Sequence, residues 1–596
     1  MAQEDVQDLN AAELESLLAP FFAEKLEEHN VPGAVFIMVK DGEVLFANGY
    51  GYADVEQQIP YDATETIIRG GSTIKPITAL AVMQLAEQGK VDVHADINQY
   101  LTSFQLPDTF AEPVTLHHLL HHTSGIDSKF SNTRVDTISE LEPLGAFLAR
   151  ELPERVAPPG EIRNYNDFGI ALAGLVVEEV SGMTFAEYAE QNIFAPLQMN
   201  DTWMIVPESE VPRMANGYTA VSGRVEPNLV GNYLLNTAPG AAYNTTAMDL
   251  GNYMLAYLQN GRFGDTQIVQ PESMAELQRT QFQHNPHMPG MAYAFDEVYQ
   301  NGYRLLAKSG GAPGTNNRMV LIPEENVAFF VSYNRHHGRL HNDLTNLIMD
   351  TYFPENGEPT FDTAVSTDLA PYTGYYREHI GYSATTFEKI SGIGNQIQVT
   401  ANENGTLNMF GRELQSVGDG LLQRTDNGDY VAAGKDSVGK QYLFFARTAY
   451  ERLPWYETMP VQLGLLLFSL VVFVAAIVFW LWGVRHGAGN GRILGAIIGL
   501  ANILFIVGFA LFFMNLTGSG EPPWLIEYGM PQQLVVLLAI PLITLALTVV
   551  FVGLTAVNGF NHQLGTMQAI MNILIIFGCT AFYFFLYTWN LIGYHA

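Results

Sequence analysis

The chain has 596 residues and a formal net charge of −32, from 61 acidic and 29 basic residues. A chain of this length predicts several domains, and the lack of a basic excess excludes nucleic acid as a partner, because few cations remain to neutralise phosphates. The charge is unevenly distributed. From residue 456 onward the charged side chains are only Arg485, Arg492, Glu457, Glu521 and Glu527, so an acidic front precedes an almost uncharged back.

Residues 11–355 alternate strand-like and helix-like segments. GAVFIMVKDGEVLFANGYGYAD predicts a hairpin that turns at Asp41 and Gly42, and RMVLIPEENVAFFVSYN predicts a second hairpin near the end of this region. PITALAVMQLAEQGK predicts an amphipathic helix ended by glycine. Strands at both ends with helices between them predict an α+β domain, in which an antiparallel sheet carries a helical subdomain.

The acidic, Pro- and Gly-rich stretch FPENGEPTFDT separates that region from a run of short predicted strands. The strand candidates are GYYREH, QIQVTANENGTLNMFG, LQSVGDGLLQRT and KQYLFFART, with Gly, Asn and Asp turns between them. Residues 365–453 are therefore predicted to form a small all-β, lipocalin-like barrel. Two roles stay open for it: a spacer that holds the first domain off a bilayer, or a domain that binds a ligand or covers an active site.

Residues 458–596 are predicted to be a transmembrane domain. Four apolar runs each have the roughly 20 residues needed to cross the hydrocarbon core, and they follow one another with almost no polar face. The predicted helices are about 461–482, 493–516, 534–557 and 567–591. Arg485 and Arg492 flank the first loop, so the positive-inside rule places that loop in the cytoplasm and both chain ends outside. Asn502 and Asn572 are expected to join helices by hydrogen bonds.

These features predict a multi-pass protein of the bacterial cell membrane, with the first two domains on the extracytoplasmic side. MAQEDVQDLN has neither a basic start nor an apolar core, so we expect that a signal peptide has been removed. The sole cysteine, Cys579, lies in the last apolar run, so no intrachain disulfide forms. Beyond the lipid bilayer, a homodimer through the membrane helices stays open as a partner.

Ser72 and Lys75, in GGSTIKPITAL, stand one helical turn apart at the start of a predicted helix. This spacing puts both side chains on one face, where a lysine that accepts the hydroxyl proton makes the serine a nucleophile. The alternative is a capping serine beside a solvated lysine. Farther along, Tyr165 opens a helix-like run in EIRNYNDFGIALAGLVVEEVSG, and LLAKSGGAPGTNN contains a Lys-Ser-Gly run at the start of a predicted strand.

In this order the three motifs resemble those of the serine β-lactamase and penicillin-binding protein family, most closely its class C and D-aminopeptidase/esterase branches. Supporting matches are TLHHLLHHTSGI, APGAAYNTTAMDLGNYM and GGAPGTNNRMVLIPEENVAFFVSYN. The resemblance covers about residues 15–350, and it implies a β-lactamase/transpeptidase-like fold for them.

The resemblance also implies roles for four side chains. Ser72 attacks an acyl carbonyl, and Lys75, with a pKa lowered by burial and a neighbouring cation, shares the serine proton. Tyr165 carries that proton to the leaving group. Lys308 supplies positive charge for Tyr165 or for a substrate carboxylate. By the same analogy, deacylation falls to Tyr165 and Lys75, because the chain lacks the Glu-x-x-Leu-Asn segment of class A enzymes.

The remaining expected site residues hold the oxyanion or the substrate. The backbone N–H groups of Ser72 and Gly311 correspond to the oxyanion hole, and Ser309 and Gly310 belong to the substrate-binding strand. The family motif Tyr-Ser-Asn or Tyr-Ala-Asn reads Tyr-Asn-Asp here, with Asp167 at its third position. Asp167 either balances the charge of the two lysines, recognises a free amine on the substrate, or is a tolerated polar replacement.

Two groups of histidines invite a metal hypothesis. The i, i+4 spacing in HHLLHH can present two ligands on one helix face, but no H-E-x-x-H pattern accompanies it, and the matching family segment carries histidine without metal. We predict helix packing for the first group, a surface loop for the second, no metal site and no cofactor. The first group is His117, His118, His121 and His122, and the second is His336, His337 and His341.

The sequence thus predicts a membrane-anchored, exported serine hydrolase that forms an acyl-enzyme on peptide or amide bonds. The resemblance implies substrates with a D-residue next to the scissile bond. Some members with membrane helices are peptidases that mature nonribosomal peptide prodrugs, although the β domain and the fourth helix do not match them. Alternatives are a penicillin-binding D,D-peptidase, an esterase or lipid hydrolase, and a non-catalytic ligand sensor that signals through the helices. A transporter is disfavoured, because the apolar runs contain almost no ionisable residues.

Overall fold

The computed structural model of the chain describes the structure of residues 9–221, 224–228, 231–336, 339–354, 362–365, 368–379, 385–484, 490–517 and 524–595. His337, Arg485 and most of the FPENGEPTFDT linker lie outside the described residues. Contacts divide the chain into two compact units. The first comprises Met1–Ser128, Thr133–Leu369 and Asn402–Tyr450, and the second comprises Lys129–Asn132, Ala370–Ala401 and Glu451–Ala596.

The first unit is built on a seven-stranded antiparallel sheet with the order β10-β11-β12-β13-β1-β2-β3. Its strands are β1 (Gly33–Lys40), β2 (Glu43–Asp54), β3 (Ile59–Pro60), β10 (Asp296–Gln300), β11 (Tyr303–Ala312), β12 (Thr315–Ile322) and β13 (Val327–Tyr333). Both predicted hairpins are confirmed. The first turns at Asp41 and Gly42, which have φ values of 51° and 89°, as a tight two-residue hairpin turn requires.

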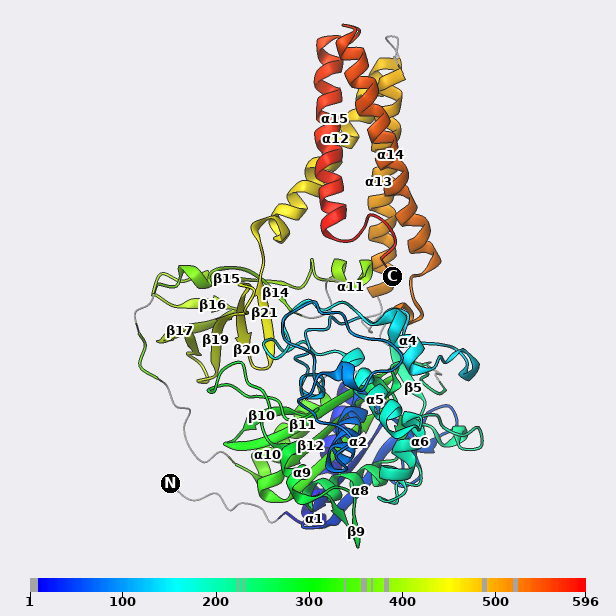
Figure 1. The fold of residues 1–596 in the computed structure, drawn as a ribbon, viewed down its shortest axis with the longest axis vertical. Helices are drawn as coiled ribbons and strands as arrows, with labels where there is room; N and C mark the ends of the chain where they lie inside the picture. Colours follow the sequence, from blue (N-terminus) through cyan, green and yellow to red (C-terminus); the bar gives the residue numbers. More distant parts are fainter. Residues whose placement is uncertain are drawn as a thin grey trace. The chain divides into compact units, whose positions relative to one another are not determined.

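Helices cover both faces of this sheet. On one face, α1 (Ala11–Glu28) and α10 (Leu340–Tyr352) pack against alternate residues of β1 such as Phe36. On the other, α2 (Lys75–Glu87), α5 (Asp167–Ser181) and α8 (Ala247–Leu258) share a core with Val35 and Ile37 (Figure 1). The predicted α+β class is therefore confirmed. The prediction that the helix after Ser72 is amphipathic is wrong, because residues 75–85 of α2 are all buried.

The remaining elements of this unit are short. The helices are α3 (Leu116–Leu120), α4 (Leu144–Glu151), α6 (Phe185–Ala189), α7 (Ala238–Ala241) and α9 (Pro271–Gln278). The strands are β4 (Ile68–Arg69), β5 (Gly217–Val221), β6 (Arg224–Asn228), β7 (Asn244–Thr245), β8 (Arg262–Phe263) and β9 (Thr266–Gln267). β4 pairs with β7 directly before the 3₁₀ turn Gly71–Ile74, so this pair delivers the chain to Ser72.

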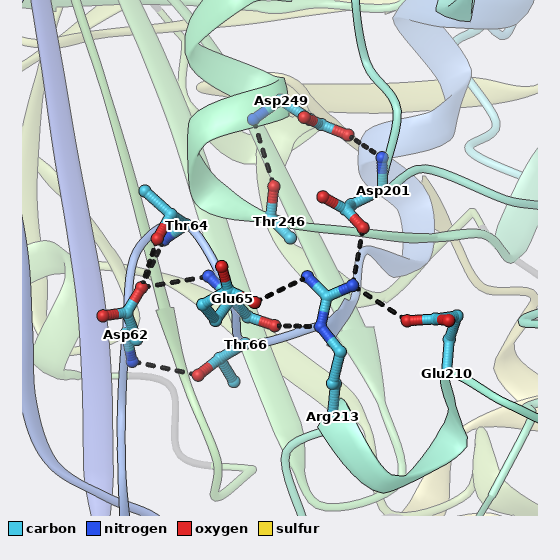
Figure 2. A network of polar contacts seen from close by, with 9 residues as sticks. All are labelled: Asp62, Thr64, Glu65, Thr66, Asp201, Glu210, Arg213, Thr246 and Asp249. Carbon is cyan, nitrogen blue, oxygen red and sulfur yellow. Dashed lines mark hydrogen bonds and ion pairs between the residues drawn. The ribbon is translucent and has the colours of Figure 1, made fainter.

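A polar network centred on Arg213 fixes the approach to β4 (Figure 2). Its Nη1 lies 2.7 Å from Asp201 Oδ1 and 2.9 Å from Glu210 Oε2, and its Nε donates to the carbonyl of Glu65 at 3.1 Å. Asp249, in the first turn of α8, accepts from the backbone N–H of Asp201 at 2.8 Å. Three segments far apart in sequence are thus joined beside the strand that leads to the catalytic turn.

A closed eight-stranded barrel follows, with its strands in the order β14 to β21. Its strands are β14 (Gly374–Glu378), β15 (Gln396–Ala401), β16 (Leu407–Met409), β17 (Arg412–Gly418), β18 (Leu421–Arg424), β19 (Tyr430–Lys435), β20 (Gln441–Phe445) and β21 (Thr448–Arg452). The predicted barrel is confirmed. The sequence reading missed β19, β21 and the short helix α11 (Thr386–Ser391), whose sequences lack clear alternation of apolar and polar residues.

The part of the barrel that belongs to the first unit packs against the α+β domain. Leu421, Ala432 and Phe444 share a buried apolar cluster with Ala157, Ile162 and Met288. The rings of Phe444 and His284 stack with centroids 4.0 Å apart. These contacts join strands β18, β19 and β20 to the α+β domain.

Four helices of the second unit are long and apolar enough to cross a membrane. They are α12 (Met459–Val484), α13 (Asn490–Thr517), α14 (Gln532–Phe560) and α15 (Thr566–Thr588), so the fourth ends three residues before its predicted end. The two expected hydrogen bonds are present. Thr544 on α14 donates to Asn502 Oδ1 on α13 at 2.8 Å, and Asn572 on α15 donates to Thr555 Oγ1 on α14 at 3.1 Å.

Candidate active site

Ser72 lies in a 3₁₀ turn against the edge of β11. Gly71 has a φ of +57°, a left-handed conformation that favours glycine. A Cβ on Gly310 would lie 2.3 Å from the carbonyl oxygen of Gly70, and one on Gly71 would lie 2.9 Å from the backbone N of Gly311. Two backbones separated by well over 200 residues therefore touch without intervening side chains, and this contact sets the position of Ser72.

Lys75 and Tyr165 both reach the Ser72 hydroxyl, as the motifs predict. Lys75 Nζ donates to Ser72 Oγ at 2.8 Å, and Tyr165 OH donates to the same oxygen at 2.9 Å. Ser72 is half-buried, whereas Lys75 is fully buried. Tyr165 comes directly before the N-cap of α5, where Asn166 accepts from the backbone N–H of Gly169. The start of α5 thus holds Tyr165 over the start of α2.

Asp167 is the second polar partner of Lys75. Asp167 Oδ1 lies 2.6 Å from Lys75 Nζ, and the carbonyl of Gly240 accepts a third hydrogen bond from the same ammonium group. Burial lowers the pKa of Lys75, but attraction to the Asp167 carboxylate and the contacts with Tyr165 outweigh burial and raise that pKa above its usual value. The expectation of a lowered Lys75 pKa is therefore wrong. The pKa is raised mainly by Asp167, the residue that departs from the family motif.

Lys308 faces the ring of Tyr165 rather than its hydroxyl. Lys308 Nζ lies 4.6 Å from the centroid of that ring, and Lys75 Nζ lies 4.7 Å from it. Burial, with repulsion from Lys75, lowers the pKa of Lys308 to about 7. Burial raises the pKa of Tyr165 despite the nearby Lys75, so the phenol is neutral at neutral pH. Lys308 is the sixth residue of β11 rather than the first of a strand, as the sequence reading had it.

The other predicted site residues lie on the same strand. Ser309 is exposed and stands opposite Arg318 of β12. Gly310 packs on Gly70, so its small size allows the close approach described above. The backbone N–H of Gly311 is brought beside the turn that holds Ser72, the arrangement that an oxyanion hole requires.

A chain of charges that the sequence reading did not identify extends from Tyr165 to the barrel. The Arg163 guanidinium lies 5.8 Å from the Tyr165 ring centroid and 3.0 Å from Asp296 Oδ1. Arg447, on the barrel, contacts the same carboxylate oxygen at 3.3 Å. Burial raises the pKa of Asp296, but Arg447 and Arg163 outweigh it and lower that pKa to about 2. Asp296 in turn raises the pKa of Lys308, so the barrel acts electrostatically on the site.

Two more buried residues support the site. Asn317 of β12 donates to the carbonyls of Arg69 and Gly70 at 2.7 and 3.0 Å, which ties the central sheet to the turn before Ser72. The ring of His122 lies 4.5 Å from that of Tyr165. Burial lowers the pKa of His122 well below its usual value, so it packs as a neutral ring. The packing predicted for the first histidine group therefore holds for His122.

The other histidines of that segment make packing contacts. His117 Nδ1 lies 2.8 Å from Tyr293 OH, and His121 Nδ1 lies 3.0 Å from Thr123 Oγ1. In the second group, His341 Nδ1 lies 2.8 Å from Tyr333 OH and is buried, so the prediction of a surface loop is wrong for this residue. In the described part of the chain, no group of three or more His, Cys, Asp or Glu side chains is placed to hold a metal ion.

A cavity of about 810 Å³ lies in the helical subdomain. Its lining includes Leu144, Leu175, Phe185, Tyr233 and Pro239, and it does not include the reactive serine. The cavity is therefore distinct from the cluster formed by Ser72, Lys75 and Tyr165.

Comparisons with known proteins agree with this geometry. Residues 18–352 match the family model described as "Beta-lactamase". "Penicillin-binding protein 4*" of Bacillus subtilis (strain 168) is 25% identical over 313 residues, which are 49% of this chain and 66% of that protein. "Protein flp" of Staphylococcus aureus (strain N315) is 27% identical over 323 residues, which are 52% of this chain and 61% of that protein. The match thus spans less than two thirds of the latter.

Among solved structures, the one described as "Crystal structure of SurE" has a TM-score of 0.54 at 20% sequence identity. The match covers 74% of this chain and 99% of that one. At this level of identity the likeness shows a shared fold.

Proposed function

Because the chain belongs to the beta-lactamase family, whose fold and homologues indicate serine hydrolase activity, we propose that it is a membrane-anchored acyl-enzyme hydrolase of peptide or amide bonds. One observation supports this most strongly: the Ser72 hydroxyl accepts hydrogen bonds from both Lys75 and Tyr165, at 2.8 and 2.9 Å. A site that only binds a ligand has no need of a nucleophile held between two proton carriers.

Acylation begins with the Lys75 and Asp167 pair. The Lys75 ammonium passes one proton to the Asp167 carboxylate, 2.6 Å away, and the neutral amine then takes the hydroxyl proton of Ser72. Ser72 Oγ bonds to the acyl carbon as the carbonyl π bond opens toward the N–H groups of Ser72 and Gly311. In this scheme Asp167 balances the charge of Lys75 and also stores a proton.

Collapse of the tetrahedral intermediate releases the leaving group. Tyr165 donates its proton to the departing nitrogen as the C–N bond breaks, and Lys75 returns a proton to Tyr165. Asp167 then gives its proton back to Lys75, which restores the starting charges. In deacylation Lys75 again passes a proton to Asp167. A water molecule then gives one proton to Tyr165 while Tyr165 gives its own to the neutral Lys75, and the water oxygen bonds to the acyl carbon. Ser72 Oγ takes one proton back from Lys75 through Tyr165 as its bond to the acyl carbon breaks, and Asp167 returns its proton to Lys75.

The substrate class follows from the family resemblance. We propose a peptide or amide with a D-residue next to the scissile bond, and a substrate carboxylate near Lys308. This lysine is buried, with the cations Lys75 and Arg163 near it against the carboxylates of Asp167 and Asp296, so an anionic group there meets an excess of positive charge in a chain that is otherwise acidic.

The four apolar helices support membrane anchoring. The candidate spans contain 25, 25, 29 and 23 residues, each longer than the roughly 20 needed to cross a bilayer core. With Arg485 and Arg492 beside the first loop, the positive-inside rule places that loop in the cytoplasm and the catalytic domain outside. We propose this orientation for the chain.

The test is active-site labelling of the full-length protein in detergent. A fluorophosphonate and a fluorescent penicillin are compared on the wild type, on Ser72→Ala and on Ser139→Ala, whose serine is exposed and remote from the motifs. We expect labelling in the wild type and in Ser139→Ala and none in Ser72→Ala. Turnover is then measured on matched N-acyl-D- and N-acyl-L-amino-acid amides and esters.

Turnover of D-amides, lost in Ser72→Ala, supports the peptidase. Turnover of esters alone shifts the proposal to an esterase of the same fold. A folded wild type that neither labels nor turns over any substrate contradicts the hydrolase and favours the ligand sensor.

A further inference from the structure

The membrane domain contains a polar cavity of about 360 Å³ between three of its helices. Arg492, in the first turn of α13, lines it together with residues at the end of α14 and at the start of α15. The other polar side chains of its lining are Thr555, Asn558, Gln563, Gln568 and Asn572. Three of these side chains are joined to one another, since Gln568 donates to Asn572 Oδ1 at 2.8 Å and Asn572 donates to Thr555 Oγ1 at 3.1 Å. The cavity is therefore a polar space in an otherwise apolar bundle, and such a space suits a polar occupant.

Arg492 brings positive charge to this cavity. Its Nε donates to Gln568 Oε1, and its guanidinium lies 4.5 Å from the ring centroid of Phe479. Among the described residues, no carboxylate lies within ion-pair distance of Arg492. The described carboxylates next to the membrane helices are Glu457 and Glu527. They lie before the N-termini of α12 and α14, whereas the cavity lies at the C-terminal ends of these helices. In the part of the chain that the structure describes, neutral groups thus hold the cation, and N–H donors of its guanidinium remain for an anion.

Two features around the arginine favour an anion. The N-terminus of α15 adjoins the cavity through Gly565, and that N-cap has no side-chain hydrogen bond, so the positive end of the helix dipole faces the same space. Gly483 at the end of α12 makes room for the guanidinium, because a Cβ there would lie 2.5 Å from Arg492 Nη1. The arginine is thus seated by its surroundings rather than extended into solvent.

The position of the cavity indicates the source of the anion. Consecutive membrane helices run in opposite directions, so the loop before α13 and the loop between α14 and α15 lie at the same end of the bundle. This is the level of lipid headgroups. Phe551, which is buried in the bundle, and Leu554, which is exposed, provide apolar walls. A guanidinium fork with amide donors matches a phosphate group, and basic pockets between membrane helices bind anionic headgroups.

We propose that this cavity binds the phosphate of a phospholipid headgroup through Arg492, Gln568 and Asn558. The proposal rests on the membrane anchoring proposed above and is independent of the hydrolase activity. A bound lipid would join α13, α14 and α15 at one end of the bundle.

The test is native mass spectrometry of the full-length protein in detergent, titrated with dioleoyl phosphatidylglycerol or with dioleoylglycerol, which has the same chains but no phosphate. We expect one phosphatidylglycerol to be retained in preference to dioleoylglycerol. Arg492→Gln should weaken this retention about tenfold or more, since a charge-assisted contact is lost, and Arg492→Lys should weaken it less. Arg485→Gln makes the same charge change seven residues earlier in the sequence and should leave retention unchanged.

A second variant covers the case in which Arg492→Gln fails to fold. Gly483→Ala favours the helix but displaces the guanidinium, so it should weaken lipid retention without lowering the melting temperature. A separate titration with inorganic phosphate identifies the source of the anion. Stabilisation by phosphate through Arg492, with no preference between the two lipids, supports the anion site and assigns it to free phosphate.

Equal retention of both lipids with no phosphate effect overturns the proposal, as does an equal loss in Arg485→Gln and Arg492→Gln. Fluorophosphonate labelling of the same samples reports on Ser72, and alkaline extraction of membranes reports on anchoring. A failure of the proposed hydrolase activity or of the proposed membrane anchoring is therefore distinguished from a failure of the lipid site.

Discussion

The ammonium of Lys75, which is fully buried, and the carboxylate of Asp167, which is partly exposed, form an ion pair with 2.6 Å between Nζ and Oδ1. The same nitrogen donates to Ser72 Oγ and to the carbonyl of Gly240, so all three of its N–H donors have acceptors. A lysine in this state has no lone pair with which to take a proton from serine. In the proposed mechanism Lys75 therefore first loses a proton, and the carboxylate of Asp167, at hydrogen-bond distance, accepts it.

Replacement of Asp167 by Asn tests this assignment. We expect kcat to fall about tenfold or more, since proton transfer to a positioned group contributes on that scale, and we expect KM to change little. Steady-state kinetics on two matched amides, one with a free amine and one without it, should show equal losses. A KM that rises mainly for the amine-bearing substrate would show instead that Asp167 recognises that amine.

Tyr165→Phe removes one oxygen and keeps the ring between Lys75 and Lys308. The fold should be retained, because the ring contacts remain. We expect kcat for amides to fall by a factor of about 10² to 10⁴, the usual contribution of a proton-transferring side chain. Steady-state assays of the purified variant measure kcat, and its melting temperature shows whether the fold is retained. Near wild-type turnover in the variant would remove Tyr165 from the mechanism.

The pH dependence of kcat/KM should follow Lys308. Its pKa is lowered to about 7 by burial and by Lys75, so it is charged below pH 7 and loses its charge above that pH. If that charge holds a substrate carboxylate, kcat/KM falls as the pH rises through about 7. Lys308→Arg keeps the charge at higher pH and should extend the activity. A rate that increases steadily from pH 7 to 9 in the wild type argues against this role.

Substitutions of Asp296 and Arg447 should shift, in opposite directions, the pH at which kcat/KM falls (the alkaline limb of the pH profile). The Asp296 carboxylate raises the pKa of Lys308, so Asp296→Asn should move the limb to lower pH. Arg447 neutralises Asp296, so Arg447→Gln should free the carboxylate to act on Lys308 and move the limb to higher pH. A pH profile of each variant measures both shifts. If both variants have the same pH profile as the wild type, the contact between Arg447 and Asp296 has no electrostatic effect on Lys308 and serves only in packing.

Gly310→Ala should damage the site and the fold together. The added Cβ would lie 2.3 Å from the Gly70 carbonyl oxygen, and forcing an atom into a packed contact costs about 1 to 3 kcal/mol. We expect a lower melting temperature and loss of fluorophosphonate labelling. Gly231→Ala is the matched control, because no atom lies within 4 Å of a Cβ built there. Equal stability of the two variants would contradict the close approach.

Local chemistry made much of this protein predictable from its sequence. The Asp41-Gly42 turn, the Ser72 to Lys75 spacing and the four apolar runs are each encoded within a few residues, and each was read correctly. The barrel strands with weak alternation were missed, because β19 and β21 are defined by their neighbours in the closed sheet. The shortness of these strands leaves little periodicity to detect.

The electrostatics of the site could not be read in the same way. The pKa of Lys75 depends on a carboxylate 92 residues away in sequence. The family motif shows that Asp167 is unusual, but it does not show that Asp167 raises the pKa of Lys75. Asp296 and Arg447 meet across two domains, and no spacing rule connects them. His122 was assigned to packing, which is correct, but its neighbour Tyr165 was visible only in three dimensions.

The contact between Gly70 and Gly310 also has a consequence for the time at which this protein becomes reactive. A ribosome has made Ser72, Lys75 and Tyr165 long before it reaches β11. Until that strand emerges and pairs with β12, the turn that carries the nucleophile has no backbone to rest on and no second donor for the oxyanion. A nascent or truncated chain that ends before residue 312 would carry the three proton-handling residues and remain chemically silent. Reactivity is thereby withheld until the catalytic domain is almost complete.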